Sequence, residues 1–145
     1  MGFLNRLFGS SENQMPAERD VVHVAAGRGF TFDVVGESEF QRALSKICGG
    51  KKAGGHKHEA TAHLRFAANP HDPNAIAVDI AGKQVGWIPS ALTPEIRREI
   101  VAVSSTGNVA CKAKIVGGWN EEDSEGHFGV KLSLSRPLKR AIKAG

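Results

Sequence analysis

Apolar and polar residues alternate over several stretches of this chain, and the alternation predicts a domain built mainly from short β-strands. Successive side chains of a strand point to opposite faces, so a strand with one buried face has an apolar residue at every second position. The clearest example is residues 58–67, whose apolar face would be Ala60, Ala62, Leu64 and Phe66. Further strands are predicted at residues 21–25, 30–35, 75–80, 84–88, 108–116 and 127–134.

Two other stretches have apolar residues at helical spacing. The first predicted helix covers residues 38–48 and ends at Gly49 and Gly50, because glycine readily adopts the conformation that stops a helix. Its apolar face would be Phe40, Ala43, Leu44 and Ile47. The second is predicted to start at Thr93 and Pro94, a combination favoured at a helix N-terminus. Its apolar face would be Ile96, Ile100 and Val103.

The segments between these elements are predicted to be turns and loops. Residues 69–74 contain proline, asparagine and aspartate, which favour tight turns because they preset φ or bond to nearby backbone. Residues 81–83 are predicted to join two strands as a hairpin. We expect a flexible basic loop at residues 49–56 and a polar loop at residues 117–126.

Together these elements predict a mainly β domain of the α+β class, a small OB-like or SH3-like antiparallel β-barrel with two helices. We expect the domain to span residues 21–136. Residues 1–20 are predicted to form a short amphipathic helix and a linker, and residues 137–145 a basic tail, with a helix after Pro137 as one option. The apolar face of the N-terminal helix would be Phe3, Leu4, Leu7 and Phe8.

Composition and charge fit a single globular domain. The chain has 145 residues, of which 41% are hydrophobic and 23% charged, enough for a core without a disulfide framework. With 19 Lys and Arg against 15 Asp and Glu, the formal net charge is +4, which permits a nucleic-acid partner without requiring one. Cys48 and Cys111 are expected to be reduced, and no segment has the pattern of a signal peptide or a membrane span. We therefore expect a soluble cytoplasmic protein.

Enzyme and metal motifs are scarce. The glycine-rich residues 49–55 are followed by His56 where a phosphate-binding loop needs Lys, and neither H-E-x-x-H nor G-x-S-x-G occurs. His56 and His58 would share one face of a strand and are the candidates for a metal site, but a zinc site normally has paired ligands on two segments. Additional ligands would be His63, His71, Cys48 and Cys111. We predict no enzyme activity and no cofactor, with zinc as the alternative.

Three motifs in the first two thirds of the chain carry a family resemblance. They are Val34-Val-Gly-Glu-Ser-Glu-Phe-Gln41, Asn69-Pro-His-Asp-Pro-Asn-Ala-Ile-Ala-Val78 and Lys83-Gln-Val-Gly-Trp-Ile-Pro89. Their order and distances resemble those of HIRAN domains. The ending, Ile115-Val-Gly-Gly-Trp119 with Gly126-His-Phe-Gly-Val-Lys-Leu132, is similar to stand-alone bacterial members, so the resemblance covers roughly residues 21–136. It implies an OB-like barrel that recognises the 3′ end of single-stranded DNA, a module that eukaryotic members fuse to a remodelling helicase.

The resemblance implies roles for particular residues. Phe40 matches an aromatic residue near the DNA-end pocket, and Asp72 matches an acidic residue that accepts a hydrogen bond from a terminal hydroxyl. His71 stands where the family often has a base-stacking Tyr, and Trp87 follows the Val-Gly pair, where it would also stack a base. Positive charge toward phosphate would come from Lys83, with Lys51 and Lys52 as secondary contacts.

Other features leave alternatives open. Ser38 and Glu39 stand where the DNA-end binder has Arg and Tyr, and Glu39 would repel phosphate, so specificity for a 3′ end stays undecided. Phe40 and Trp87 would also suit a hydrophobic core, and Asp72 would also suit the stabilisation of a turn.

The function predicted on this basis is a non-catalytic nucleic-acid-binding module for single-stranded DNA or DNA ends. It would act in DNA repair, replication or defence beside a separate helicase or nuclease. One alternative is a protein–protein adaptor that docks a partner through its terminal segments. Another is a zinc-binding accessory to a hydrolase that uses His56 and His58.

Overall fold

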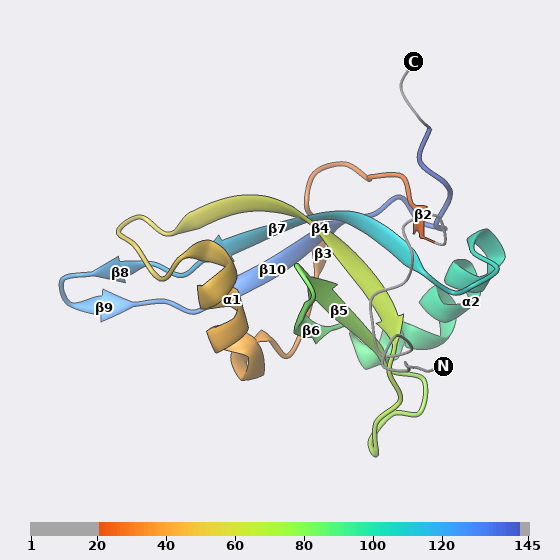
Figure 1. The fold of residues 1–145 in the computed structure, drawn as a ribbon, viewed down its shortest axis with the longest axis horizontal. Helices are drawn as coiled ribbons and strands as arrows, with labels where there is room; N and C mark the ends of the chain where they lie inside the picture. The colour runs from red at the N-terminus through yellow and green to blue at the C-terminus, as the bar shows by residue number, and fades with distance from the viewer. Residues whose placement is uncertain (1–20, 143–145) are drawn as a thin grey trace, which may run out of the picture.

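The structure, a computed structural model, describes residues 21–142. A seven-stranded sheet curls into a half-barrel, with two α-helices beside it (Figure 1). In spatial order its strands are β3 (Phe32–Asp33), β10 (Phe128–Ser133), β7 (Val109–Gly117), β4 (His56–Phe66), β5 (Ile76–Ile80) and β6 (Lys83–Trp87). These neighbours are antiparallel, whereas β2 (Val22–His23) pairs with β7 in parallel. The predicted mainly β fold with two helices is confirmed.

Each α-helix is preceded by a 3-10 turn. The turn η3 (Glu37–Phe40) leads into α1 (Gln41–Cys48), and η4 (Ser90–Leu92) leads into α2 (Thr93–Val103). Both α-helices lie where the apolar spacing predicted them. The buried positions are Leu44 in α1 and Thr93, Ile96 and Ile100 in α2, whereas Val103 is only half-buried.

The core lies inside the curve of the sheet, where the alternating apolar positions of neighbouring strands meet. Leu64 of β4, Val78 of β5 and Ile115 of β7 are at most 2% exposed. Lys57 and Thr61 point to the other face of β4 and are exposed. Complete burial of an aliphatic side chain contributes about 1.5–3 kcal/mol, so the same alternation that predicted the strands also supplies the main drive to curl the sheet.

The two outer strands of the curled sheet meet at a bridge between Val35 and Trp87. The Val35 N–H donates to the Trp87 carbonyl at 2.9 Å, and the Trp87 N–H donates to the Val35 carbonyl at 2.8 Å. Gly86 permits this approach, because a Cβ at its position would lie 2.3 Å from Val34 Cγ1 and 2.9 Å from the Val35 oxygen. A residue larger than glycine at position 86 would therefore prevent the Val35–Trp87 bridge by steric clash.

Side chains of η3 and α1 take the place of a longer strand beside β10. β3 pairs with only two residues of β10. Beyond them, Glu37 Oε2 accepts a hydrogen bond from the Val130 N–H at 3.1 Å. Gln41 Oε1 accepts from the Phe128 N–H at 2.8 Å, and Gln41 Nε2 donates to the Phe128 carbonyl at 2.9 Å. The backbone edge of β10 is thereby satisfied by two side chains four residues apart.

The segment after Pro137 is extended and packed, so the helix considered for it is wrong for the described residues 137–142. Leu138 is 5% exposed, and the Ala25 N–H donates to the Lys139 carbonyl at 2.8 Å. This segment therefore lies beside β2 as part of the folded domain, and the domain boundary expected before it falls within packed structure.

Glu99 of α2 holds the C-terminal segment in place. Its carboxylate accepts hydrogen bonds from Arg136 Nε at 3.2 Å, from Arg136 Nη2 at 2.7 Å and from the Leu138 N–H at 3.1 Å. The hydrogen bond from Arg136 is the main reason that the pKa of Glu99 lies below its ordinary value.

Two predicted loops are more ordered than expected. Within residues 117–126, β8 (Asn120–Glu121) and β9 (Ser124–Glu125) form a hairpin that extends beyond β7 and β10, at the left of Figure 1. The Lys52 N–H donates to the Gly118 carbonyl at 3.1 Å, which ties residues 49–56 to the base of this hairpin. That loop is therefore not a free basic segment.

The structure describes only part of the N-terminal region for which elements were predicted. The strands predicted at residues 21–25 and 30–35 are reduced to β2 and β3, because much of each segment pairs outside a regular ladder. The helix and linker predicted at residues 1–20 lie outside the described residues.

Replacing Gly86 by alanine is expected to lower the free energy of unfolding by about 1–3 kcal/mol, the usual cost of forcing a carbon into packed structure. The new Cβ would clash with Val34 and with the Val35 backbone. Gly129→Ala is the matched control, since a Cβ there would meet its nearest atom at 3.5 Å. Urea denaturation of the two variants makes the comparison. Equal stability would contradict the role of Gly86 in closing the sheet.

Acid is expected to weaken the link between α2 and the C-terminal segment. Because the pKa of Glu99 is lower in the folded protein than its ordinary value of 4.5, the link stabilises the protein above that value and is lost as the pH falls through the folded pKa. Glu99→Gln removes the titrating group. Its melting temperature should therefore drop less than that of the wild type between about pH 5 and about pH 3, as followed by circular dichroism. The same drop in both proteins would contradict this assignment.

Candidate nucleic-acid interface

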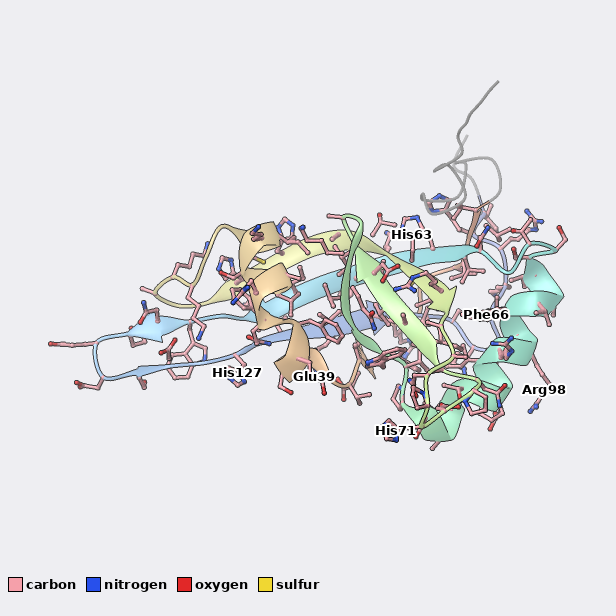
Figure 2. All side chains as sticks on the ribbon, turned by 60° about the horizontal axis from the view of Figure 1, so that its bottom comes forward. Glu39, His63, Phe66, His71, Arg98 and His127 are labelled. Atoms are coloured by element: carbon pink, nitrogen blue, oxygen red, sulfur yellow. The ribbon has the colours of Figure 1, made fainter. Side chains whose placement is uncertain are left out.

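One end of the half-barrel brings together three segments that are distant in the sequence, residues 35–40, 69–74 and 87–93, which we call the rim. The Val35–Trp87 bridge joins the first segment to the third. The second approaches the third where the Thr93 hydroxyl lies 3.5 Å from Asp72 Oδ2. Figure 2 shows Glu39 and His71, from two of these segments, at the lower edge of the ribbon.

Four of the sequence-predicted residues lie on the rim, although their surroundings differ. Phe40 and Trp87 are half-buried, His71 is exposed and Asp72 is half-buried. The structure therefore gathers residues whose positions span nearly fifty places in the sequence. The hydrogen bonds and packing of each residue decide which of its groups can contact a ligand.

The turn at residues 69–74 is held by its own side chains. Asn69 Oδ1 accepts hydrogen bonds from the backbone N–H groups of His71 and Asp72, each at 2.8 Å. Asp72 Oδ1 accepts from the Asn74 N–H at 2.9 Å. Asp72 therefore stabilises the turn, as one sequence interpretation proposed, and its other oxygen faces Thr93. The turn presents the exposed His71 ring at its tip.

Trp87 is half-buried, and its indole packs against the backbone of Gly36. A Cβ at Gly36 would lie 3.0 Å from Trp87 Cδ1, so the indole rests against the backbone there. Gly36 has φ 79°, a left-handed conformation that favours glycine. The backbone of Trp87 closes the sheet at Val35, and the residue as a whole is half-buried.

The three lysines named as phosphate contacts do not join the rim. Lys83 begins β6 opposite Ile80, whereas Trp87 ends the same strand opposite Ala77. Lys51 forms an ion pair with Glu125, which lowers the pKa of Glu125. Lys52 lies on the same loop as Lys51.

The loop that holds these two lysines faces an acidic hairpin. The Gly54 N–H donates to Glu121 Oε2 at 2.8 Å. The exposed carboxylates of the hairpin are Glu121, Glu122, Asp123 and Glu125. A phosphate that approaches Lys51 or Lys52 would therefore also meet these exposed carboxylates.

The sequence analysis did not single out the arginines beside the rim. A shallow groove of about 350 Å³ is lined by Asn74, Pro94, Arg97, Arg98 and Val101. Four of these residues have the i, i+3, i+4, i+7 spacing of one helix face, and this regularity was the signal available in the sequence. The spacing alone did not indicate a groove, because the groove also requires that the helix lies next to the turn at residues 69–74.

The metal candidates occupy the far end of β4. His56 Nε2 lies 2.8 Å from the Gly50 carbonyl, and the His56 ring packs 5.5 Å from the Phe128 ring, centroid to centroid. His58 is exposed. Among residues 21–142 no three His, Cys, Asp or Glu side chains are grouped as metal ligands would be.

Burial keeps both cysteines in the thiol form. It raises the pKa of the Cys111 thiol to about 12. It also raises the pKa of Cys48, where nearby Lys52 acts in the opposite direction. Because the thiolate is the reactive and metal-binding form, neither side chain is activated for such chemistry.

Comparisons with protein-family models, with curated proteins and with solved structures found no match to this chain. Within the described part of the chain, no helix is long and apolar enough to cross a membrane.

Proposed function

We propose that this protein is a non-catalytic module that binds single-stranded DNA along the rim. The observation that carries the proposal is the exposed His71 on the turn that ends at Asn74, which also lines a groove with Arg97 and Arg98, while the half-buried Trp87 lies on another segment of the rim. Proteins that bind single strands combine ring surfaces for bases with cations for phosphates, and each stacked base contributes about 1–3 kcal/mol. The resemblance of residues 34–90 to HIRAN domains supports the same function.

Binding along the strand fits the rim better than capture of a 3′ end. Ser38 and Glu39 replace the Arg and Tyr that the resemblance would require, and the carboxylate of Asp72 is engaged by its own turn. We place the module in cytoplasmic DNA repair, replication or defence, beside a separate helicase or nuclease.

Trp87→Leu is expected to weaken binding of a fluorescein-labelled oligothymidine by about 5- to 150-fold, the equivalent of about 1–3 kcal/mol for one stacked base. Leucine keeps apolar contact with Gly36 but removes the ring. Fluorescence anisotropy measures the affinity, and a thermal melt of the same sample shows whether the fold is intact. Trp119→Leu, on the distant hairpin side, is the matched control and should keep the wild-type affinity. A folded Trp87→Leu protein that binds as the wild type does would contradict the proposal.

Glu39→Gln should strengthen binding of the same oligomer, because it removes a negative charge from the rim. A gain of roughly two- to five-fold corresponds to about 0.5–1 kcal/mol, the scale of one exposed charge interaction. Glu122→Gln, on the acidic hairpin, changes the net charge equally and is the control. If the two variants gain equally, the effect belongs to net charge and the rim is not the binding surface.

A further inference from the structure

We propose that the groove along α2 binds the phosphodiester backbone of the strand after it leaves the rim. The inference rests on the proposed function and adds a second contact surface to it. Arg97 and Arg98 would bind consecutive phosphates, with Asn74 at the end of the groove next to the rim.

The first argument is continuity. Asn74 ends the turn that presents His71, and Pro94 directly follows the rim segment 87–93. The groove therefore begins where the rim ends. Figure 2 shows His71 near one end of α2 and Arg98 projecting outward from the same helix. A strand stacked on the rim rings can follow the helix without crossing the acidic hairpin.

The second argument is the position of Arg97. Its guanidinium carbon lies over the Phe66 ring, 3.9 Å from the ring centroid, a cation–π contact that holds the group at the groove. Phe66 is itself confined, because a Cβ at Gly107 would lie 3.1 Å from its Cε2 atom. A cation–π contact does not use the guanidinium N–H donors, so they are left for a phosphate, which arginine can bind with two parallel hydrogen bonds.

The third argument is the distribution of charge around α2. Its acidic residues Glu95 and Glu99 face Arg136, at 3.7 Å and 2.7 Å from Nη2. Within residues 21–142, neither Arg97 nor Arg98 has a carboxylate within ion-pair distance. The C-terminal segment thus engages both acidic residues of the helix, and the two arginines of the groove are left outside these ion pairs.

The apolar residues of the groove favour a nucleotide chain over a free anion. Val101 is 56% exposed and Pro94 is exposed, so both arginines stand beside apolar surface. Sugars and bases can cover such surface while the phosphates meet the arginines. A small inorganic anion would leave it in water.

The test compares the full-length wild type with Arg97→Gln/Arg98→Gln in binding oligothymidine over a series of salt concentrations. Each phosphate contact contributes about 0.7 to the log–log salt slope, so losing two should reduce the slope by about 1.4. At 0.1 M salt, a slope difference of about 1.4 means that the double variant binds the oligomer roughly 25-fold more weakly than the wild type. The control, Arg28→Gln/Lys57→Gln, removes two exposed charges elsewhere and should change the slope little.

The outcomes separate this inference from the proposed function. A wild type that does not bind the oligomer would overturn both. A wild type that binds, with a double variant of unchanged slope and affinity, would overturn the groove alone. If loss of the Arg97–Phe66 contact lowers the melting temperature, Arg98→Gln alone should still reduce the slope by about 0.7. Tighter, Arg98-dependent binding of a phosphoserine peptide than of the oligomer would also overturn the assignment.

Discussion

The curled sheet depends on the contacts that residues 34–41 make with two strands at once. On one side, the backbone of Val35 pairs with Trp87, and only a glycine at position 86 leaves room for this approach. On the other, Glu37 and Gln41 satisfy the backbone of β10 where β3 is too short to do so. An unpaired sheet edge is costly when buried and prone to aggregation when exposed. A single short segment therefore closes the curve and protects the edge.

The rim follows from this closure. Bringing η3 against β6 sets the half-buried Phe40 near the strand that ends in Trp87, and the open end of the β5–β6 hairpin holds the turn at residues 69–74 beside α2. Because Asn69 and Asp72 fix the turn internally, His71 stands on a preformed loop. A rigid surface of this kind loses little conformational entropy when a flexible strand binds.

Charge is distributed unevenly between the two ends of the molecule. The β8–β9 hairpin concentrates carboxylates at one end, where Lys51 is engaged by Glu125. At the other end, Arg136 draws the carboxylates of α2 to one side and leaves two arginines on the groove. A polyanion approaching such a charge pattern would be steered toward the groove along α2 and away from the hairpin.

The sequence by itself determined the features that depend on neighbours a few residues apart. Alternation at residues 58–67 located β4, the spacing of Ile96 and Ile100 located α2, and residues 69–74 predicted their own turn. Tertiary structure decided what depends on distant partners: the buried position of Leu138, the pairing of Lys51 with Glu125 and the arginine groove. Local pattern records which face of an element is apolar, because periodicity follows from backbone geometry. It does not specify which distant element covers that face, and this is why the burial of Leu138 and the pairing of Lys51 with Glu125 emerged only from the structure.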